Sequence, residues 1–213
     1  MNGISEMRET YDKGTLDESH VVSDAIKQFE IWFQEAKEAD ILEPNAMALS
    51  TLGLDGTPQS RIVLLKGLEE EGFIFYTNYE SDKGKEIAKN PNASLLFLWK
   101  SIQRQVRVSG TIEKVSREKS ERYFHSRPKG SQVGAWVSPQ SRVISDKEKL
   151  HKRKKELLKQ YKDEDKLPLP DFWGGYILIP TKIEFWQGRP NRLHDRLRYT
   201  REEKDWKIER IAP

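Results

Sequence analysis

Residues 183–187 read Ile-Glu-Phe-Trp-Gln and, after four further residues, residues 192–196 read Arg-Leu-His-Asp-Arg. Side chains alternate between the two faces of a β-strand, so a strand through the second stretch would place Arg192, His194 and Arg196 on one face. Two guanidinium groups and an imidazole in one row repel one another unless water or an anion meets them. The row is therefore either a solvated edge strand or part of an anion site.

The aromatic residues just upstream favour the anion site. Phe185 and Trp186 can form a flat apolar wall beside the three cationic side chains. Cations next to an aromatic wall suit a flat, negatively charged ligand.

Short strand patterns separated by turn residues surround this region. Alternation and turn signals such as Asp55-Gly56 predict strands at 46–52, 60–68, 73–78, 93–98, 104–115, 174–179, 182–186, 192–199 and 206–211. Helices are expected after a Ser23 cap and over 82–89, 118–124 and 146–161. The predicted fold is mainly β with peripheral helices, an antiparallel barrel, which removes unpaired sheet edges.

Composition indicates one domain that works without thiol chemistry. The chain has 213 residues, no cysteine and a net charge of +3, with acidic and basic residues interspersed. We expect a charged, mobile arm over 1–20 and a single domain over 21–213. Nothing resembles a signal peptide or a membrane span, so we expect a soluble, cytoplasmic protein with no membrane partner. No nucleic-acid partner is expected, and the Lys/Arg run at 152–155 is predicted to be a solvated helix face.

Three other groups of polar residues have two interpretations each. Arg61 and Lys66 bracket an apolar strand and, being five apart, should point to opposite faces, as at the ends of a core strand. Residues 104–109 place Gln105, Arg107 and Ser109 on one face, which is commonly a solvated row. Residues 123–131 combine hydroxyl groups with a guanidinium, which suits either a phosphate site or an ordinary helix end.

Several functional classes have no support in the sequence. There is no P-loop, dinucleotide fingerprint or catalytic triad, and the four histidines are too scattered to predict a metal site. The residues alone thus predict a barrel that binds a phosphorylated planar ligand, and they leave the reaction open.

The same stretches resemble the pyridoxine 5'-phosphate oxidase family. The two strings at 183–187 and 192–196 match its signature without a gap, and the resemblance extends over 61–66, 75–78, 104–106, 123–128, 134–138 and 172–175. Members are FMN-binding split β-barrels that form homodimers, with each FMN between the subunits. The resemblance implies oxidation of pyridoxamine and pyridoxine 5'-phosphates by O2 to pyridoxal 5'-phosphate, in vitamin B6 biosynthesis and salvage. Hydrogen peroxide, and ammonia from the amine, would be released after a hydride passes from C4' to flavin N5.

The resemblance also implies the residues of the site. From one part of the dimer, FMN would be bound by Arg61, Ile62, Val63, Leu64, Leu65, Lys66, Tyr76, Thr77, Lys83 and Gln105. From the other part of the dimer it would be bound by Gln140, Ser141, Trp186 and Arg196. The substrate would be bound by Arg8, Tyr11, Lys66, Tyr123, Arg127, Ser131, Arg192, Leu193 and His194, with Arg192 and His194 as the catalytic residues.

One position departs from the family pattern, and two other functions remain open. Asp82 stands where an arginine often precedes Lys83, and an inward carboxylate there would repel the FMN phosphate. A split-barrel oxidase of the phenazine pathway is the nearest alternative, and the complete set Lys66, Tyr123, Arg127 and Ser131 favours the vitamin phosphate. A barrel that binds nucleic acid through its basic strands is the second.

Overall fold

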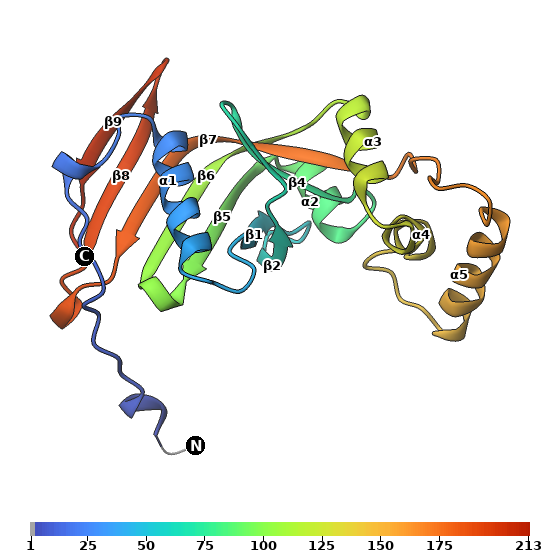
Figure 1. Cartoon of the computed structure of the whole chain (residues 1–213), viewed down its shortest axis with the longest axis horizontal. Helices are drawn as coiled ribbons and strands as arrows, with labels where there is room; N and C mark the ends of the chain where they lie inside the picture. The colour runs from blue at the N-terminus through green and yellow to red at the C-terminus, as the bar shows by residue number, and fades with distance from the viewer. Residues whose placement is uncertain (1–2) are drawn as a thin grey trace.

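The computed structural model describes residues 3–213, so the first two residues of the expected arm lie outside the described part. One antiparallel sheet forms its body, and helices cover the sheet at one side and at one end (Figure 1). Its strands are β1 Ala46–Leu52, β2 Pro58–Leu64, β3 Gly67–Glu69, β4 Gly72–Asn78, β5 Asn92–Trp99, β6 Arg104–Lys114, β7 Trp173–Gln187, β8 Asp195–Glu202 and β9 Asp205–Arg210.

The sheet closes because one segment of chain pairs with both of its ends. The strand order is β2-β1-β5-β6-β7-β4-β3, and β2 and β3 are consecutive. Between them, the Leu65 N–H donates to the Asn45 carbonyl and the Lys66 N–H donates to the Ile74 carbonyl, each over 2.8 Å. The sequence predicted one strand over 60–68, but the chain leaves β1 at this point and joins β4. This switch completes the expected antiparallel barrel.

The long strand β7 extends the barrel into a second, smaller sheet. Its first half pairs with β4 and its second half with β8, which pairs with β9. The sequence predicted two strands here, at 174–179 and 182–186, whereas the structure has one. Strand β6 is irregular at Gly110, where the β6–β7 register shifts after Ser109. A Cβ at Gly110 would lie 2.0 Å from the Ile179 carbonyl oxygen, so only glycine fits there.

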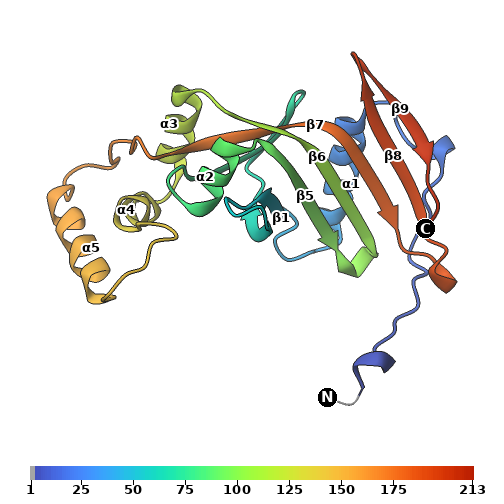
Figure 2. The same cartoon turned by 180° about the vertical axis from the view of Figure 1, so that it is seen from behind.

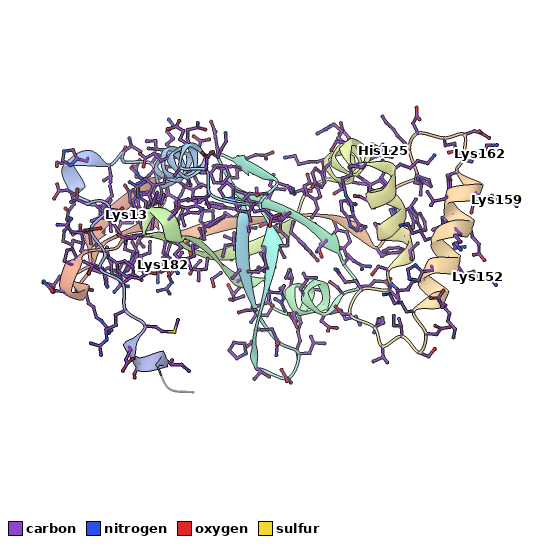
Figure 3. The ribbon with its side chains drawn as sticks, turned by 60° about the horizontal axis from the view of Figure 1, so that its bottom comes forward. Lys13, His125, Lys152, Lys159, Lys162 and Lys182 are labelled. Atoms are coloured by element: carbon purple, nitrogen blue, oxygen red, sulfur yellow. The ribbon has the colours of Figure 1, made fainter. Side chains whose placement is uncertain are left out.

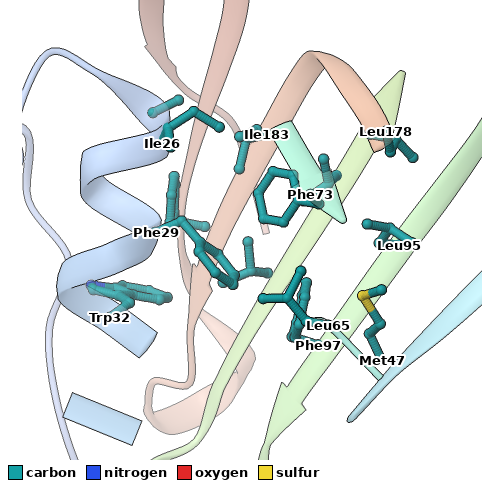
Figure 4. Packing of buried hydrophobic residues seen from close by; sticks show 14 of the residues in the cluster. Ile26, Phe29, Trp32, Met47, Leu65, Phe73, Leu95, Phe97, Leu178 and Ile183 are labelled. Carbon is teal, nitrogen blue, oxygen red and sulfur yellow. The ribbon is translucent and has the colours of Figure 1, made fainter. Parts of the chain in front are cut away.

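Helix α1, Ala25–Glu38, covers one opening of the barrel. Its N-cap is Asp24, whose side chain accepts from the Lys27 N–H, and not Ser23 as expected. The Phe29 ring is buried 4.8 Å from the Phe73 ring and 4.9 Å from the Phe97 ring, measured between centroids (Figure 4). The apolar face of this predicted helix therefore seals the core of the barrel.

The remaining helices gather at the far end of the molecule (Figure 2). They are α2 Asp82–Lys89, α3 Arg117–Ser126, α4 Lys129–Val137 and α5 Glu148–Gln160. Short 3-10 turns lie elsewhere: η1 Ile4–Glu6 and η2 Glu18–His20 on the arm, η3 Lys100–Ile102 between β5 and β6, and η4 Pro190–Arg192 between β7 and β8. A second apolar cluster, which includes Phe124, Val133, Leu157 and Trp173, joins α3, α4 and α5 to the barrel. Helix α4 was not predicted, since its two glycines are poor helix formers and tertiary packing stabilises it.

The basic helix α5 faces solvent, as predicted. Every residue from His151 to Gln160 is exposed except Leu157. Figure 3 shows Lys152 and Lys159 on this helix and Lys162 just beyond it, far from the β8–β9 end. Within residues 3–213, no helix has both the length and the apolar character that crossing a membrane requires.

Candidate functional site

A cavity of about 690 Å³ opens between β2, β4 and the helices α2, α3 and α4. It is lined by Arg61, Ile62, Val63, Leu64, Lys66, Tyr76, Thr77, Asn78, Lys83, Tyr123, Arg127, Ser131, Gly134, Ala135, Ser138, Gln140 and Trp173. Residues predicted from distant parts of the sequence to bind cofactor or substrate thus share one cavity, which we call the phosphate cavity.

Arg61 and Lys66 both line the phosphate cavity, so the prediction that they point to opposite faces is wrong. Strand β2 ends at Leu64, and alternation no longer applies beyond it. Leu65, which was predicted to contact the cofactor, is instead 7% exposed and packs in the core. The irregular step between β2 and β3 turns Lys66 toward the cavity.

Glu86 holds Arg61 in place, and sequence reasoning missed it. Its Oε2 lies 2.7 Å from Arg61 Nη2 and accepts from Thr51 Oγ1 over 2.5 Å. Glu86 is 5% exposed, and a buried carboxylate needs such partners. The signal available in the sequence was its position three residues after Lys83, on the same face of a short helix.

Lys83 brings a buried positive charge to the phosphate cavity. It is 9% exposed, and its Nζ donates to Gln140 Oε1 over 3.2 Å and to Ser81 Oγ over 3.3 Å. Burial lowers the pKa of Lys83, and the nearby charge of Arg61 lowers it further. An anion bound here would reverse both effects, so the site is suited to a phosphate.

Gln140 contacts the phosphate cavity of its own chain. It was expected from the other subunit, but its Oε1 accepts from Thr77 Oγ1 over 3.3 Å in the same chain, because the segment after α4 folds back over the start of α2.

Asp82 is exposed at the first turn of α2 and does not line the cavity. Its charge acts to raise the pKa of Lys83, which opposes the effect of burial.

A stack of aromatic rings forms one wall of the phosphate cavity. The Tyr76 ring lies 3.8 Å from the Tyr123 ring at an interplanar angle of 16°, and 5.6 Å from the Trp173 ring at 12°. Burial raises the pKa of both tyrosines, so their hydroxyl groups keep their protons and can donate hydrogen bonds.

Arg127 is fixed over this wall with an unused donor. Its guanidinium lies 4.7 Å from the centre of the Trp173 ring, and its Nη2 donates to the Ser131 carbonyl over 2.9 Å. Within residues 3–213 its Nη1 is buried without a hydrogen-bond partner, and burial lowers the pKa of the half-buried side chain. A guanidinium with such an unused, buried N–H is the group expected where a phosphate oxygen binds.

A second cluster lies at the β7–β8 end and consists of Tyr11, Trp186 and His194; we call it the ring cluster. The His194 ring is 4.6 Å from the Trp186 ring and 5.7 Å from the Tyr11 ring. His194 Nδ1 accepts from the Arg189 N–H over 3.1 Å, so the proton of the neutral imidazole is on Nε2. Burial, followed by the charge of Arg192, lowers the pKa of His194.

The predicted cationic row does not form as expected. Asn191 and Arg192 have φ angles of 55° and 63°, which no β-strand accommodates, so the turn η4 replaces the start of the predicted strand. Strand β8 begins at Asp195, and among the three cations only Arg196 lies on it. Arg192 and Leu193 are exposed in the preceding turn.

Arg196 lies in one row across the sheet with two other residues predicted to bind the flavin. Gln105 pairs with Trp186, and Trp186 pairs with Arg196, across β6, β7 and β8. The carboxylate of Glu184 neutralises Arg196, with Nη2 and Oε1 2.9 Å apart.

Five predicted cofactor residues do not line the phosphate cavity. In the described range 3–213, its lining includes neither the core residue Leu65 nor Gln105, Ser141, Trp186 and Arg196. Ser141 is exposed with a φ of 68°, and Arg8 is exposed on the arm. The predicted site is therefore divided between two regions of one chain.

The barrel and its cavity define a protein of the split-barrel class. A structure titled PhzG from Burkholderia lata 383 in complex with tetrahydrophenazine-1-carboxylic acid superposes with a TM-score of 0.89 at 31% identity, over 96% of this chain and 100% of that one. A pyridoxamine 5'-phosphate oxidase-related, FMN binding protein from Nostoc punctiforme PCC 73102 shares the fold, with a TM-score of 0.70 at 17% identity, over 87% of this chain and 97% of that one.

The chain belongs to the pyridoxamine 5'-phosphate oxidase family. The family model of that description matches residues 33–160, and the pyridoxine 5'-phosphate oxidase C-terminal dimerisation region matches residues 173–213. Proteins called pyridoxine/pyridoxamine 5'-phosphate oxidase are 53% identical in Salinibacter ruber and 52% identical in Paraburkholderia phytofirmans, each over the full length of both chains.

Proposed function

We propose that this protein is an FMN-dependent oxidase that converts pyridoxamine and pyridoxine 5'-phosphates to pyridoxal 5'-phosphate. The observation that carries the proposal is Arg127, whose buried Nη1 has no hydrogen-bond partner within residues 3–213 and which shares one cavity with Lys66, Tyr123 and Ser131. Full-length identity of about half with oxidases of this name supports the same substrates.

The phosphate cavity also fits the FMN phosphate. Lys83 and Arg61 supply two cations, and the hydroxyl group of Thr77 and the amide of Gln140 supply hydrogen bonds. The bound flavin would accept the hydride and pass its electrons to O2. Asp82 points to solvent, so its negative charge weakens this phosphate site less than an inward carboxylate would.

A homodimer would unite the two regions of the site. The phosphate cavity holds the residues proposed for both phosphates, whereas Trp186 and Arg196, proposed to contact the flavin, lie on β7 and β8. Residues 173–213, which include both strands, match a dimerisation region. We infer that Trp186 and Arg196 of one subunit meet the FMN held by the other.

The residues near the ring would orient the substrate and stabilise charge. Arg192 and neutral His194 would lie over the pyridine ring, and His194 can donate a hydrogen bond from Nε2 because Arg189 occupies Nδ1. Arg196 would stabilise the negative charge that reduction places on the flavin, without transferring a proton. Arg8 and Tyr11 would cover the substrate as the arm closes.

Purified protein tests this proposal directly. It should be yellow and should release peroxide when mixed with pyridoxamine 5'-phosphate, and an Arg192→Leu variant should lose turnover while retaining FMN. A colourless protein that stays inactive with added FMN would exclude the proposed function. Equal loss of turnover and FMN in Arg192→Leu would exclude the role given to that residue.

A related oxidase acting on a tricyclic ring is the second candidate. The observation that favours it is the close superposition on the structure bound to tetrahydrophenazine-1-carboxylic acid. The two functions differ in their demand for a phosphate, so Arg127 should matter only for the vitamin phosphate. Parallel assays with both compounds distinguish them.

A further inference from the structure

The arm is attached to the barrel at two places. Gly14 and Leu16 are bonded to Arg189, Asp195 and Arg210. Around Tyr11, the arm is held by the side chain of one buried glutamine. Gln103 Oε1 accepts from the backbone N–H groups of Asp12 over 2.9 Å and Lys13 over 3.1 Å, and its Nε2 donates to the Thr10 carbonyl over 3.1 Å. Gln103 is only 7% exposed. Nearly all of its hydrogen-bonding capacity is therefore used on the backbone of the arm.

The backbone of Gln103 is itself rigidly placed. It follows η3 with a φ of 54°, and its carbonyl accepts from the Gly188 N–H over 2.8 Å and from Gln187 Nε2 over 3.2 Å. Gln187 is completely buried. The attachment point is thus fixed to the end of β7, just before the turn that carries Arg192 and His194.

These bonds fix the chain on both sides of Tyr11. Thr10 and Asp12 are its neighbours in sequence, and both are bonded to Gln103. The Tyr11 ring lies 5.9 Å from the Trp186 ring and 5.7 Å from the His194 ring. A Cβ on Gly188 would approach Tyr11 to 3.0 Å, so the arm has little room to shift.

We propose that Gln103 is a positioning residue that holds Tyr11 against the ring cluster. This inference rests on the proposed function, because Tyr11 matters only if the substrate ring binds beside His194. Among the described residues, Gln103 does not line the phosphate cavity, and its side chain bonds to the backbone of the arm on both sides of Tyr11, so it acts through the arm. The order that it imposes before binding removes part of the entropy cost of closing the arm on substrate.

The variant Gln103→Asn tests the role of the side chain. Asparagine tolerates a positive φ but is one methylene shorter, so it cannot reach the arm. We expect the KM for pyridoxamine 5'-phosphate to rise about tenfold, the effect of losing roughly one net hydrogen bond, with kcat within about twofold. FMN affinity should not change. Exchange of the Asp12 and Lys13 amide hydrogens should become faster.

Two further variants separate positioning from a general structural effect. In Gln103→Glu the carboxylate can still accept from Asp12 and Lys13 but cannot donate to Thr10, so KM should be partly restored. Gln34→Asn makes the same change at an exposed glutamine on α1 and should leave KM and amide exchange unchanged.

The double variant Gln103→Asn/Tyr11→Ala provides the decisive comparison. If Gln103 acts through Tyr11, Gln103→Asn should raise KM no further in that background. Additive effects, or an unchanged KM when the amide hydrogens exchange faster, would overturn the proposal. If Gln103→Asn does not fold, Gly14→Ala replaces it. The added Cβ would lie 2.9 Å from Gln187 Oε1 and would push the arm away from the end of β7. The proposal then requires the same rise in KM.

The amide-exchange measurement needs no substrate. A wild-type protein that fails to oxidise pyridoxamine 5'-phosphate would contradict the proposed function, whereas exchange unaffected by Gln103→Asn would contradict the attachment of the arm by this side chain.

Discussion

The phosphate cavity and the ring cluster treat positive charge in opposite ways. In the phosphate cavity Arg61 is paired with Glu86, but Lys83 is buried without a carboxylate partner, and the half-buried Arg127 has a buried Nη1 with no partner within residues 3–213. Burial lowers the pKa of Lys83 and of Arg127. Beside the ring cluster, Arg196 is paired with Glu184, and burial lowers the pKa of His194.

The difference indicates what each region recognises. Unsatisfied buried cations gain most from a ligand that carries full negative charge, which is a phosphate group. Paired cations beside flat rings gain little from charge and instead contact planar groups and set their orientation. Substitutions in the phosphate cavity should therefore cost more than substitutions at the ring cluster.

The largest effect is expected from Arg127→Met, which keeps the apolar contact with Trp173 and removes the charge. Hydrogen bonds to charged groups contribute about 1.5–3 kcal/mol, so kcat/KM for pyridoxamine 5'-phosphate should fall about 100-fold. Steady-state assays measure this loss. FMN affinity serves as the control, and an equal loss of FMN binding would show that Arg127 does not discriminate between the two phosphates.

Lys83→Met should chiefly affect the cofactor. Losing the charge-assisted contact should weaken FMN binding about 30-fold, measured by fluorescence titration of the apoprotein. Lys89→Met, at an exposed lysine of the same helix, is the matched control and should bind FMN normally. Unchanged FMN affinity in Lys83→Met would remove Lys83 from the phosphate site.

The sequence predicted those parts of the molecule that depend on local pattern. Alternation located β1 and β6 to within a residue, because one face of each strand is buried and the other is not. The strand predicted from residue 192 failed because two residues with positive φ precede β8, and sequence alternation does not report backbone conformation.

Contacts between distant residues were beyond prediction from the residues alone. Glu86 meets Arg61 across 25 positions, and Gln103 meets Asp12 across 91, so neither partner is visible in a local pattern. The family resemblance placed Arg61, Lys83 and Arg127 in a common site, but not the side chains that hold them there.

His194 should produce an intermediate effect that depends on pH. Since burial lowers the pKa of His194 from the ordinary value of 6.5, His194 is mainly neutral at pH 7 and becomes protonated below pH 6.5. Protonation removes the acceptor for the Arg189 N–H, so kcat/KM should fall as pH decreases, with a midpoint below 6.5. His194→Asn should lower kcat/KM about tenfold and abolish this acid limb. An unchanged pH profile in the variant would assign the limb to another group.

The smallest effect is expected from Glu184→Gln, which removes the carboxylate that neutralises Arg196. The freed charge should favour the reduced flavin over the oxidised form about threefold, a rise of about 15 mV in its reduction potential. Glu209→Gln, at a partly exposed carboxylate paired with Arg198, is the control and should leave the potential unchanged. A shift as large as the loss in Arg127→Met would contradict the contrast between the two regions.

If one site holds FMN and the vitamin phosphate together, pyridoxamine 5'-phosphate should reduce the flavin of the purified protein. We expect the visible flavin band to bleach when the two are mixed under anaerobic conditions, and to return with release of peroxide when oxygen is admitted. A flavin band that persists with saturating pyridoxamine 5'-phosphate would show that the two ligands do not share a site.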